Sequence, residues 1–329
     1  MGRTVAVIGE RRASLRSAQS PALMAAAEQP PPESMAKRSN GEEAEVPAKK
    51  KRPTPAKAGD SKKAAGSPAK PAAKKASGSP KVPAAHASRA REEAAWALHQ
   101  FVVGCDEAGR GPLAGPVVAA ACALPANLPP IPGVGDSKTI TDEAERERLY
   151  EEIIAAPGVA WSARVVSASR IDEINILMAS LEAMRLSIVD VLSEATPSDA
   201  LALIDGPFSP WKEGAKYVDF QLPAPPPSVS LSVEPIKGGD AKVYCIAAAS
   251  IIAKVTRDRI MHTLAEEWPM YGFEQHKGYP TAKHVHAISK HGACAAHRRS
   301  FAPLKAQNLP PPTAEQDAHI EKLCSLKSK

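Results

Sequence analysis

Two short apolar runs joined by a glycine-rich turn constrain the fold of this chain more than any other feature. Residues 101–105 and 116–124 are almost continuously apolar, which is typical of buried strands. The pattern predicts further strands at 159–168 and 201–204, and helices at 141–154, 172–191 and 243–267. Strands that alternate with helices in this way predict an α/β domain with a sheet of mixed direction.

The composition of the chain changes near residue 94. Residues 1–95 carry 19 Lys or Arg and 9 Asp or Glu, whereas residues 96–329 carry 23 and 27, so charges of +10 and −4 make up the overall +6. The first part is rich in Ala, Pro, Lys and Ser and has no aromatic residue before Trp96. Such a segment buries too little apolar surface to offset chain entropy. We therefore predict a disordered basic extension over 1–93, a catalytic domain over 94–309 and a short tail over 310–329 that can form a helix.

The extension carries two kinds of motif, and they leave its role open. Lys49–Arg52 lie between prolines in the form of a nuclear import signal. Three Ser/Thr-Pro elements resemble those of linker-histone tails, although a solubilising low-complexity segment fits the composition equally well. A nuclear location is the expectation, and the cytoplasm (for a bacterial chain) and the mitochondrion are the alternatives. A start at Met35 would leave every predicted element of the folded domain intact.

Several classes of protein are disfavoured by the sequence. The five cysteines lie far apart and form no Cys-x-x-Cys pair, which argues against a zinc site and against a disulfide scaffold. No stretch of 18 apolar residues is present, so we expect no membrane span. The first residues also lack the apolar core of a secretory signal.

Acidic residues follow the predicted strands. Asp106 and Glu107 end the first strand, Asp205 follows the strand over 201–204, and Asp240 precedes the long helix. Because ligands of α/β sheets bind beyond the carboxyl ends of strands, these four acids could converge. Carboxylates are the ligands that Mg²⁺ and Mn²⁺ prefer. Two divalent ions roughly 3.5–4 Å apart would offset their repulsion and favour displacement at phosphorus. Taken alone, the Asp106-Glu107 pair fits a solvated acidic turn as well.

Glycine, basic and aromatic residues suggest contacts to a sugar-phosphate chain. In Gly109-Arg110-Gly111 the glycines allow a close backbone approach and the arginine suits a phosphate. His276–Pro280 and His297–Phe301 each combine basic and aromatic residues. Considered separately, the first cluster also fits a loop tyrosine packed in the core, and the second fits a solvated basic surface.

Together these segments resemble type 2 ribonuclease H (ribonuclease HII) in its single-chain bacterial form. The matching stretches keep the order of the family and span nearly all of the predicted domain: Gly104–Gly115, Asp136–Lys138, Asp172–Leu177, Leu203–Gly206, Ala248–Asp258, His276–Thr281 and His297–Phe301. The resemblance implies a ribonuclease H-like fold, with a mixed central sheet flanked by helices. It also implies hydrolysis of the RNA strand of RNA–DNA hybrids and nicking on the 5′ side of single ribonucleotides embedded in duplex DNA.

The resemblance implies that Asp106, Glu107, Asp205 and Asp240 are the catalytic acids and bind Mg²⁺ or Mn²⁺. Two departures from the family pattern affect the fourth acid. More residues separate Asp205 from Asp240 than in the bacterial pattern, with a proline-rich loop as the expected insertion, and a Lys-Gly-Gly triplet replaces Lys-Gly. Asp219 lies inside that interval and competes for the role. We prefer Asp240 because it leads directly into the matching helix.

The resemblance also implies substrate contacts. The main chain of Gly109-Arg110-Gly111 would reach the ribose 2′-hydroxyl, which distinguishes RNA from DNA. Tyr279 would contact the same sugar, and Lys138 and Lys254 would contact phosphates. The expected partners are RNA–DNA hybrids and ribonucleotide-containing duplexes, and not a membrane. No Gln-x-x-Leu-x-x-Phe-Phe-like peptide for a sliding clamp is visible, and we expect a monomer.

Two other functions compete with this interpretation. One is a chromatin-type binding protein whose nuclease domain is inactive, and the four acids together with Gly109-Arg110-Gly111 weigh against it. The other is a resolvase-like DNA nuclease of the same fold. The groups expected to sense a 2′-hydroxyl, on the glycine-rich loop and at Lys277–Tyr279, weigh against that alternative.

Overall fold

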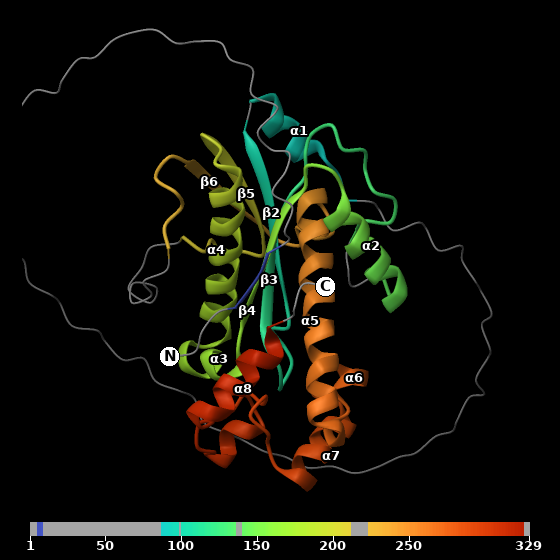
Figure 1. Cartoon of the computed structure of the whole chain (residues 1–329), viewed down its shortest axis with the longest axis vertical. Coiled ribbons are helices and arrows are strands. Elements are labelled where there is room, and N and C mark those ends of the chain that lie inside the picture. Colours follow the sequence, from blue (N-terminus) through green and yellow to red (C-terminus); the bar gives the residue numbers. More distant parts are fainter. Residues whose placement is uncertain (1–4, 9–86, 99, 136–139, 212–222, 326–329) are drawn as a thin grey trace, which may run out of the picture. The chain divides into compact units, whose positions relative to one another are not determined.

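The computed structural model describes residues 5–8, 87–98, 100–135, 140–211 and 223–325 (Figure 1). All of these belong to one compact unit, which comprises residues 1–18 and 83–329. The basic cluster Lys49–Arg52, Lys138 and Asp219 lie outside the described residues, so the predictions made for them stay predictions.

A mixed sheet of six strands forms the centre of this unit. Its spatial order is β1 (Val5–Ile8), β4 (Ala160–Val166), β3 (Val117–Ala123), β2 (Phe101–Ala108), β5 (Asp199–Asp205) and β6 (Ser230–Ile236). Pairing is antiparallel from β1 to β2, and β2, β5 and β6 run parallel. The carboxyl ends of β2 and β5 therefore lie at the same edge, which confirms the predicted α/β fold and brings Asp106 close to Asp205.

Helices cover both faces of the sheet. The described α-helices are α1 (Ala90–Ala97), α2 (Glu143–Ala155), α3 (Ala168–Ile174), α4 (Ile176–Ala195), α5 (Tyr244–Glu267), α6 (Phe273–His276), α7 (Ala282–His291) and α8 (Ala314–Cys324). In Figure 1, α4 and α5 lie on opposite sides of the strands. None of the described helices is long and apolar enough to cross a membrane.

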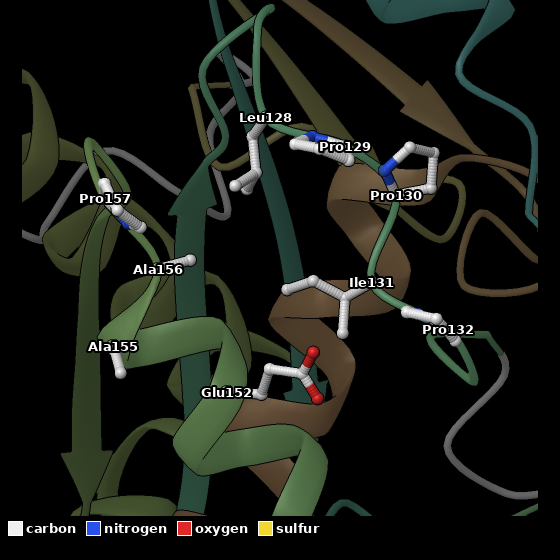
Figure 2. Close-up of a pocket in the computed structure, with 9 residues that line it drawn as sticks. All are labelled: Leu128, Pro129, Pro130, Ile131, Pro132, Glu152, Ala155, Ala156 and Pro157. Carbon is white, nitrogen blue, oxygen red and sulfur yellow. The ribbon is translucent and has the colours of Figure 1, made fainter.

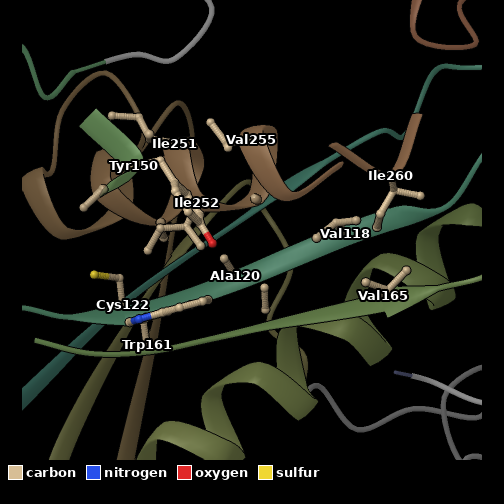
Figure 3. Close-up of a cluster of buried hydrophobic side chains, with 14 of the residues drawn as sticks. Val118, Ala120, Cys122, Tyr150, Trp161, Val165, Ile251, Ile252, Val255 and Ile260 are labelled. Carbon is tan, nitrogen blue, oxygen red and sulfur yellow. The ribbon is translucent and has the colours of Figure 1, made fainter. Parts of the chain in front are cut away.

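The two sheet faces have separate cores because successive side chains of a strand point in opposite directions. Val118, Ala120 and Cys122 of β3 pack with α5, whereas Val117, Ala119 and Ala121 pack with α4. Figure 3 shows the first core, with β3 and β4 against α5 and Tyr150 of α2. The small alanine side chains of β3 and α5 let the helix lie close to the sheet. All five cysteines are free, as their spacing predicted.

The structure differs from the predicted elements at four places. The helix predicted over 172–191 is interrupted at Asn175, which has φ +68° and caps α4 by accepting hydrogen bonds from the backbone N–H groups of Leu177 and Met178. With ψ 161°, this backbone conformation is rare for a residue other than glycine, and the side-chain cap of α4 accompanies it. The helix predicted over 141–154 begins at Glu143, after the cap residue Asp142. The C-terminal tail forms α8.

The other two differences concern strands. β6 was not predicted, because its side chains are exposed or half-buried over most of its length and form no continuous apolar run. Pro235 in this strand is compatible with its position at the edge of the sheet. β1 lies within the segment predicted to be a disordered extension, and it pairs with β4.

The segment before the first family motif is tied to the start of α5. Ser88 pairs with Val243, so contacts with the domain begin before residue 94, where the catalytic domain was predicted to start. The buried carboxylate of Glu92 accepts the backbone N–H of Cys245 at 2.7 Å. That N–H belongs to the first turn of α5 and has no partner within the helix. Helix α1 therefore caps the helix that follows Asp240.

We predict that Glu92→Ala lowers the free energy of unfolding by about 1 kcal/mol, since the first turn of α5 loses its cap. Glu92→Gln retains an oxygen that can accept the same hydrogen bond. Burial raises the pKa of Glu92, so its ionisation costs stability as the pH rises above the ordinary value of a glutamate. At pH 7 the Gln variant should therefore be at least as stable as the wild type. Chemical denaturation measures all three proteins, and the exposed neighbour Glu93→Ala serves as the control. An Ala variant as stable as this control would contradict the capping role.

Candidate active site

Three carboxylates meet at the edge of the sheet where β2 and β5 end. Asp106, Glu107 and Asp205 each offer an oxygen, and these oxygens lie within 4.8 Å of one another. Asp106 is 4% exposed, and its Oδ1 accepts the backbone N–H of Glu107. The parallel pairing of the two strands produces this convergence, which the strand-end positions had suggested.

Asp240 lies in the turn between β6 and α5, near enough for its charge to act on Asp106. It is 3% exposed, and the preceding residue, Gly239, donates its N–H to Oδ1 of Asp205 at 2.6 Å. A Cβ atom on Gly239 would lie 2.6 Å from Cδ1 of Ile246 and 3.3 Å from the carbonyl oxygen of Ile236, so a larger residue there would force its neighbours to move. Gly238 has φ +62°, which also favours glycine. The Gly-Gly pair, a departure from the family pattern, thus bonds to Asp205 directly before Asp240.

The electrostatics of the cluster fit a divalent cation. Burial raises the pKa of Asp106 well above its ordinary value, and the charges of Glu107, Asp205 and, to a lesser extent, Asp240 raise it further. Arg110 forms an ion pair with Glu107 at 3.1 Å, on the outer side of the cluster, where the arginine is 45% exposed. Several acids with hard oxygen atoms are the donor set that Mg²⁺ or Mn²⁺ would need.

The loop that follows Asp106 and Glu107 is held by the buried guanidinium of Arg298. This side chain donates to four loop carbonyls, those of Gly109 (2.6 Å), Arg110 (3.1 Å), Gly115 (2.9 Å) and Pro116 (3.0 Å). Burial lowers the pKa of Arg298, yet an arginine stays charged in proteins. The carbonyl dipoles stabilise this charge, and the charge in turn fixes the loop.

A second buried arginine, Arg257 of α5, supports the same loop. It donates to the carbonyls of Pro116 (3.0 Å), Ala114 (3.2 Å) and Lys277 (3.0 Å). Gly109 has φ +99°, and a Cβ atom there would lie 2.1 Å from Nε of Arg257. Both arginines stand within stretches that resemble the family, but no local sequence pattern assigns them a role. A charged residue on the otherwise buried face of α5 was the signal that could have identified Arg257.

Tyr279 lies beside this loop. Its ring is 44% exposed, and Cε1 would be 3.6 Å from a Cβ atom placed on Gly111. The N–H of Leu113 donates to the carbonyl of Gly278 at 2.8 Å, which joins the loop to the turn that carries the tyrosine. The structure therefore places the exposed phenol ring next to the Gly109–Gly111 loop and rejects the alternative of a tyrosine packed in the core.

The segment His297–Phe301 is also anchored from α3. The carboxylate of Asp172 accepts the backbone N–H groups of Arg299 (2.7 Å) and Ser300 (2.9 Å), and the hydroxyl of Ser300 (2.5 Å). Two stretches more than 120 residues apart in the sequence thus hold each other, and Arg298 directly precedes the residues that Asp172 binds. The cluster is a support for the loop and not a solvated basic surface.

Lys254 lies on α5, where its Nζ donates to Asp258 at 2.7 Å, and its side chain is 27% exposed. Arg146 lies 3.8 Å from the other oxygen of the same acid. The lysine is therefore held in an ion-pair network. Its predicted contact with a phosphate stays a prediction.

A pocket of about 480 Å³ lies elsewhere on the domain, between α2 and the loop after β3 (Figure 2). Its lining is mostly proline, alanine and other apolar side chains, and Glu152 supplies its carboxylate. It contains none of the site residues that the sequence predicted, so the carboxylate cluster remains the candidate active site.

Comparisons with known proteins agree with this geometry. The family model for ribonuclease HII matches residues 103–304. The chain belongs to the ribonuclease HII family. Ribonuclease HII of Bacillus anthracis is 48% identical over 205 residues, which cover 62% of this chain and 70% of that protein. Ribonuclease HII of Bacillus cereus strain Q1 is 47% identical over the same length and the same shares. The chain is therefore an endoribonuclease that acts on the RNA strand of RNA–DNA hybrids.

Solved structures of related enzymes are also similar. One is ribonuclease HII of Archaeoglobus fulgidus in a complex with PCNA (25% identity, TM-score 0.46, 65% of this chain and 98% of that one). Another is ribonuclease HIII, named Bst-RNase HIII, in complex with Mn²⁺ (18% identity, TM-score 0.48, 68% and 70%). The expectation that this chain carries no clamp-binding peptide stays a prediction.

We predict that Asp106→Asn raises the stability of the metal-free protein while it abolishes cleavage. The amide removes a buried group whose ionisation three other acids oppose, and relief of such active-site strain stabilises by about 0.5–2 kcal/mol. Thermal unfolding in EDTA measures this gain, and repeating it with added Mn²⁺ should stabilise the wild type more than the variant. The exposed Glu93→Gln serves as a control for the loss of one negative charge. Equal Mn²⁺-induced shifts in the wild type and in Asp106→Asn would contradict the metal assignment.

Proposed function

We propose that this ribonuclease HII cuts a DNA duplex on the 5′ side of a single embedded ribonucleotide, in addition to cleaving RNA–DNA hybrids. The observation that carries the proposal is the position of the exposed Tyr279 ring beside Gly111, on a loop that continues directly from Asp106 and Glu107. A sugar that contacts both the loop and the ring would lie next to the carboxylates.

In this proposal, Asp106, Glu107, Asp205 and Asp240 hold the divalent ions. Bound there, two such ions would supply an activated water and stabilise the leaving 3′-oxygen, so that the products carry 5′-phosphate and 3′-hydroxyl ends. The protein contributes the fixed positions of the acids. The Gly239 N–H orients one oxygen of Asp205, and the Glu107 N–H orients one oxygen of Asp106. Arg110, exposed and paired with Glu107, is placed to meet a phosphate oxygen at the rim.

The Gly109–Gly111 loop is proposed to recognise the 2′-hydroxyl through its main chain. Arg298 already occupies the carbonyls of Gly109 and Arg110, so the polar groups that the loop offers to a substrate are mainly N–H donors. The oxygen of a 2′-hydroxyl accepts from such donors, and a deoxyribose leaves them unpaired. Burying an unpaired donor costs about 1–3 kcal/mol, which gives selectivity for the ribonucleotide.

Outlying parts of the chain are proposed to bind the backbone of the nucleic acid. Lys138 and Lys254 would contact phosphates near the site. The basic extension over 1–93 would add affinity that does not depend on sequence and that falls as salt rises. Nuclear import through Lys49–Arg52 is a proposal of the same kind, supported by the composition of the extension alone.

We predict that a duplex with one ribonucleotide is cut on its 5′ side, whereas its all-DNA twin is inert. A site that hydrogen-bonds a hydroxyl can reject an analogue without it by roughly 10⁴–10⁵-fold. Tyr279→Ala should lose more activity on the single-ribonucleotide duplex than on long hybrids, which offer many registers. Tyr279→Phe separates stacking, which it retains, from a phenolic hydrogen bond, which it loses. A gel assay on labelled duplexes measures each rate.

The exposed Met270 supplies a control for this experiment, because Met270→Ala removes a surface side chain from the neighbouring short helix Pro269–Tyr271. It should leave both rates unchanged. Similar cutting of the two duplex twins by the wild type would reject ribonucleotide recognition and favour a resolvase-like DNA nuclease. If the protein binds both duplexes but cleaves neither of them, and cleaves no RNA–DNA hybrid, the result would favour an inactive binding protein.

A further inference from the structure

We propose that a chain of two neutral histidines, His297 and His284, positions the turn that presents Tyr279. Both are positioning residues, because they act through the main chain of Tyr279 and not on the substrate. The inference rests on the proposed role of Tyr279 in reading the ribonucleotide. It concerns a buried group of histidines that neither the carboxylate chemistry nor the loop recognition uses.

The hydrogen bonds fix the tautomer of each ring. The backbone N–H of Cys294 donates to Nδ1 of His297 at 3.1 Å, so the proton of that ring is on Nε2. This Nε2–H then donates to Nε2 of His284 at 3.1 Å, which places the proton of His284 on Nδ1. The Nδ1–H of His284 donates in turn to the carbonyl of Tyr279 at 2.9 Å. All three hydrogen bonds therefore point the same way, from the backbone N–H of Cys294 to the carbonyl of Tyr279.

A charged histidine would break this chain. An imidazolium has N–H donors at both nitrogens, so a proton added to either ring would set two donors against each other or against the Cys294 N–H. Both rings are fully buried, with exposed fractions of 0% for His284 and 1% for His297. Burial lowers the pKa of His284, and burial together with the neighbouring His284 lowers the pKa of His297 to about 3. The neutral state that the geometry requires is thus also the one that burial favours.

A third histidine, His276, packs against the chain. Its ring stacks on that of His284 with 4.5 Å between centroids. The N–H of Gly278 donates to its Nδ1 at 3.2 Å, so its Nε2–H donates to the carbonyl of Tyr271 at 2.8 Å. This ring restrains Gly278, the residue directly before Tyr279.

The turn needs such support because its backbone is unusual. Lys277 has φ +49° and Gly278 has φ +81°, and a lysine adopts such a conformation at a cost in free energy. The carbonyl of Tyr279 also accepts the N–H of Thr281 at 2.8 Å, and its own N–H donates to the carbonyl of His276 at 2.9 Å. Both main-chain polar groups of Tyr279 are therefore bonded, and His284 supplies a side-chain partner that ties the carbonyl to the interior.

The experiment compares variants that differ in one donor. His284→Leu removes the donor to Tyr279, whereas His284→Asn keeps an amide N–H at the position of Nδ1. The Leu variant should lose about 10- to 100-fold in kcat/KM on the single-ribonucleotide duplex, the scale of a displaced positioning group, and less on long hybrids. The Asn variant should recover most of that loss. His286→Leu, exposed on the same helix, is the matched control and should match the wild type on both substrates.

A merely structural role would lower both activities together and would not be rescued by Asn. If His284→Leu and His284→Asn both cleave the two substrates in the same ratio as the wild type, the inference is overturned. Should His284→Leu fail to fold, the pair His297→Met and His297→Gln decides, because glutamine can donate from the position of Nε2 and methionine cannot. Gln should then retain the substrate ratio of the wild type, and equal ratios for Met and Gln would overturn the inference.

Tyr279→Ala, assayed in parallel, separates the two proposals. A selective loss in Tyr279→Ala together with an unchanged ratio in His284→Leu rejects the histidine chain and leaves the proposed function standing. No selective loss in Tyr279→Ala rejects the proposed role of the tyrosine itself, and the histidine inference with it. Selective loss in both, with rescue by His284→Asn, supports both.

Discussion

The arrangement of the active site depends on the buried guanidinium of Arg298. An unpaired buried charge is costly, and four carbonyls of the Gly109–Pro116 loop offset that cost here. The loop cannot change shape without leaving the charge unsatisfied. Because the loop leaves β2 directly after Asp106 and Glu107, the same interaction sets the distance between the main chain that would read a sugar and the acids that would act on its phosphodiester.

The hydrogen bonds of Arg298 stabilise the fold around the active site, whereas the cluster of acids destabilises it when no cation is bound. Burial and three neighbouring acids make an ionised Asp106 unfavourable in the metal-free protein, as its raised pKa indicates. The fold tolerates this because β2 and β5 are central strands of the sheet, and their apolar side chains pack against α4 and α5 on both faces. Strain of this kind is expected where a site must hold a cation.

Local sequence patterns indicated that the acids at the strand ends could converge. They did not indicate which residues hold the surrounding loop and helix in place. Asp106 and Asp205 follow continuous apolar strands, and a parallel pair of strands brings their ends together. Local patterns carry that information. The role of Arg257 depends on carbonyls up to 143 residues away, and that of Glu92 on a helix 153 residues away, which no local pattern can show. The break at Asn175 was missed because a single capping residue interrupts the helical spacing of apolar residues only briefly. Strand β6 was missed because it lies at the edge of the sheet and has no continuous apolar run.

The most direct test of this account measures amide hydrogen exchange at Gly109–Gly111 in the presence of substrate. The Asp106→Asn variant would be bound to a duplex with one ribonucleotide and, separately, to its all-DNA twin at matched saturation. If the buried arginines hold this main chain for recognition of a 2′-hydroxyl, these amides should be protected by the ribonucleotide duplex and much less by the twin. Arg298→Met in the same background should remove that difference. Equal protection by both duplexes would contradict the account, because the loop would then contact the nucleic acid without reading its sugar.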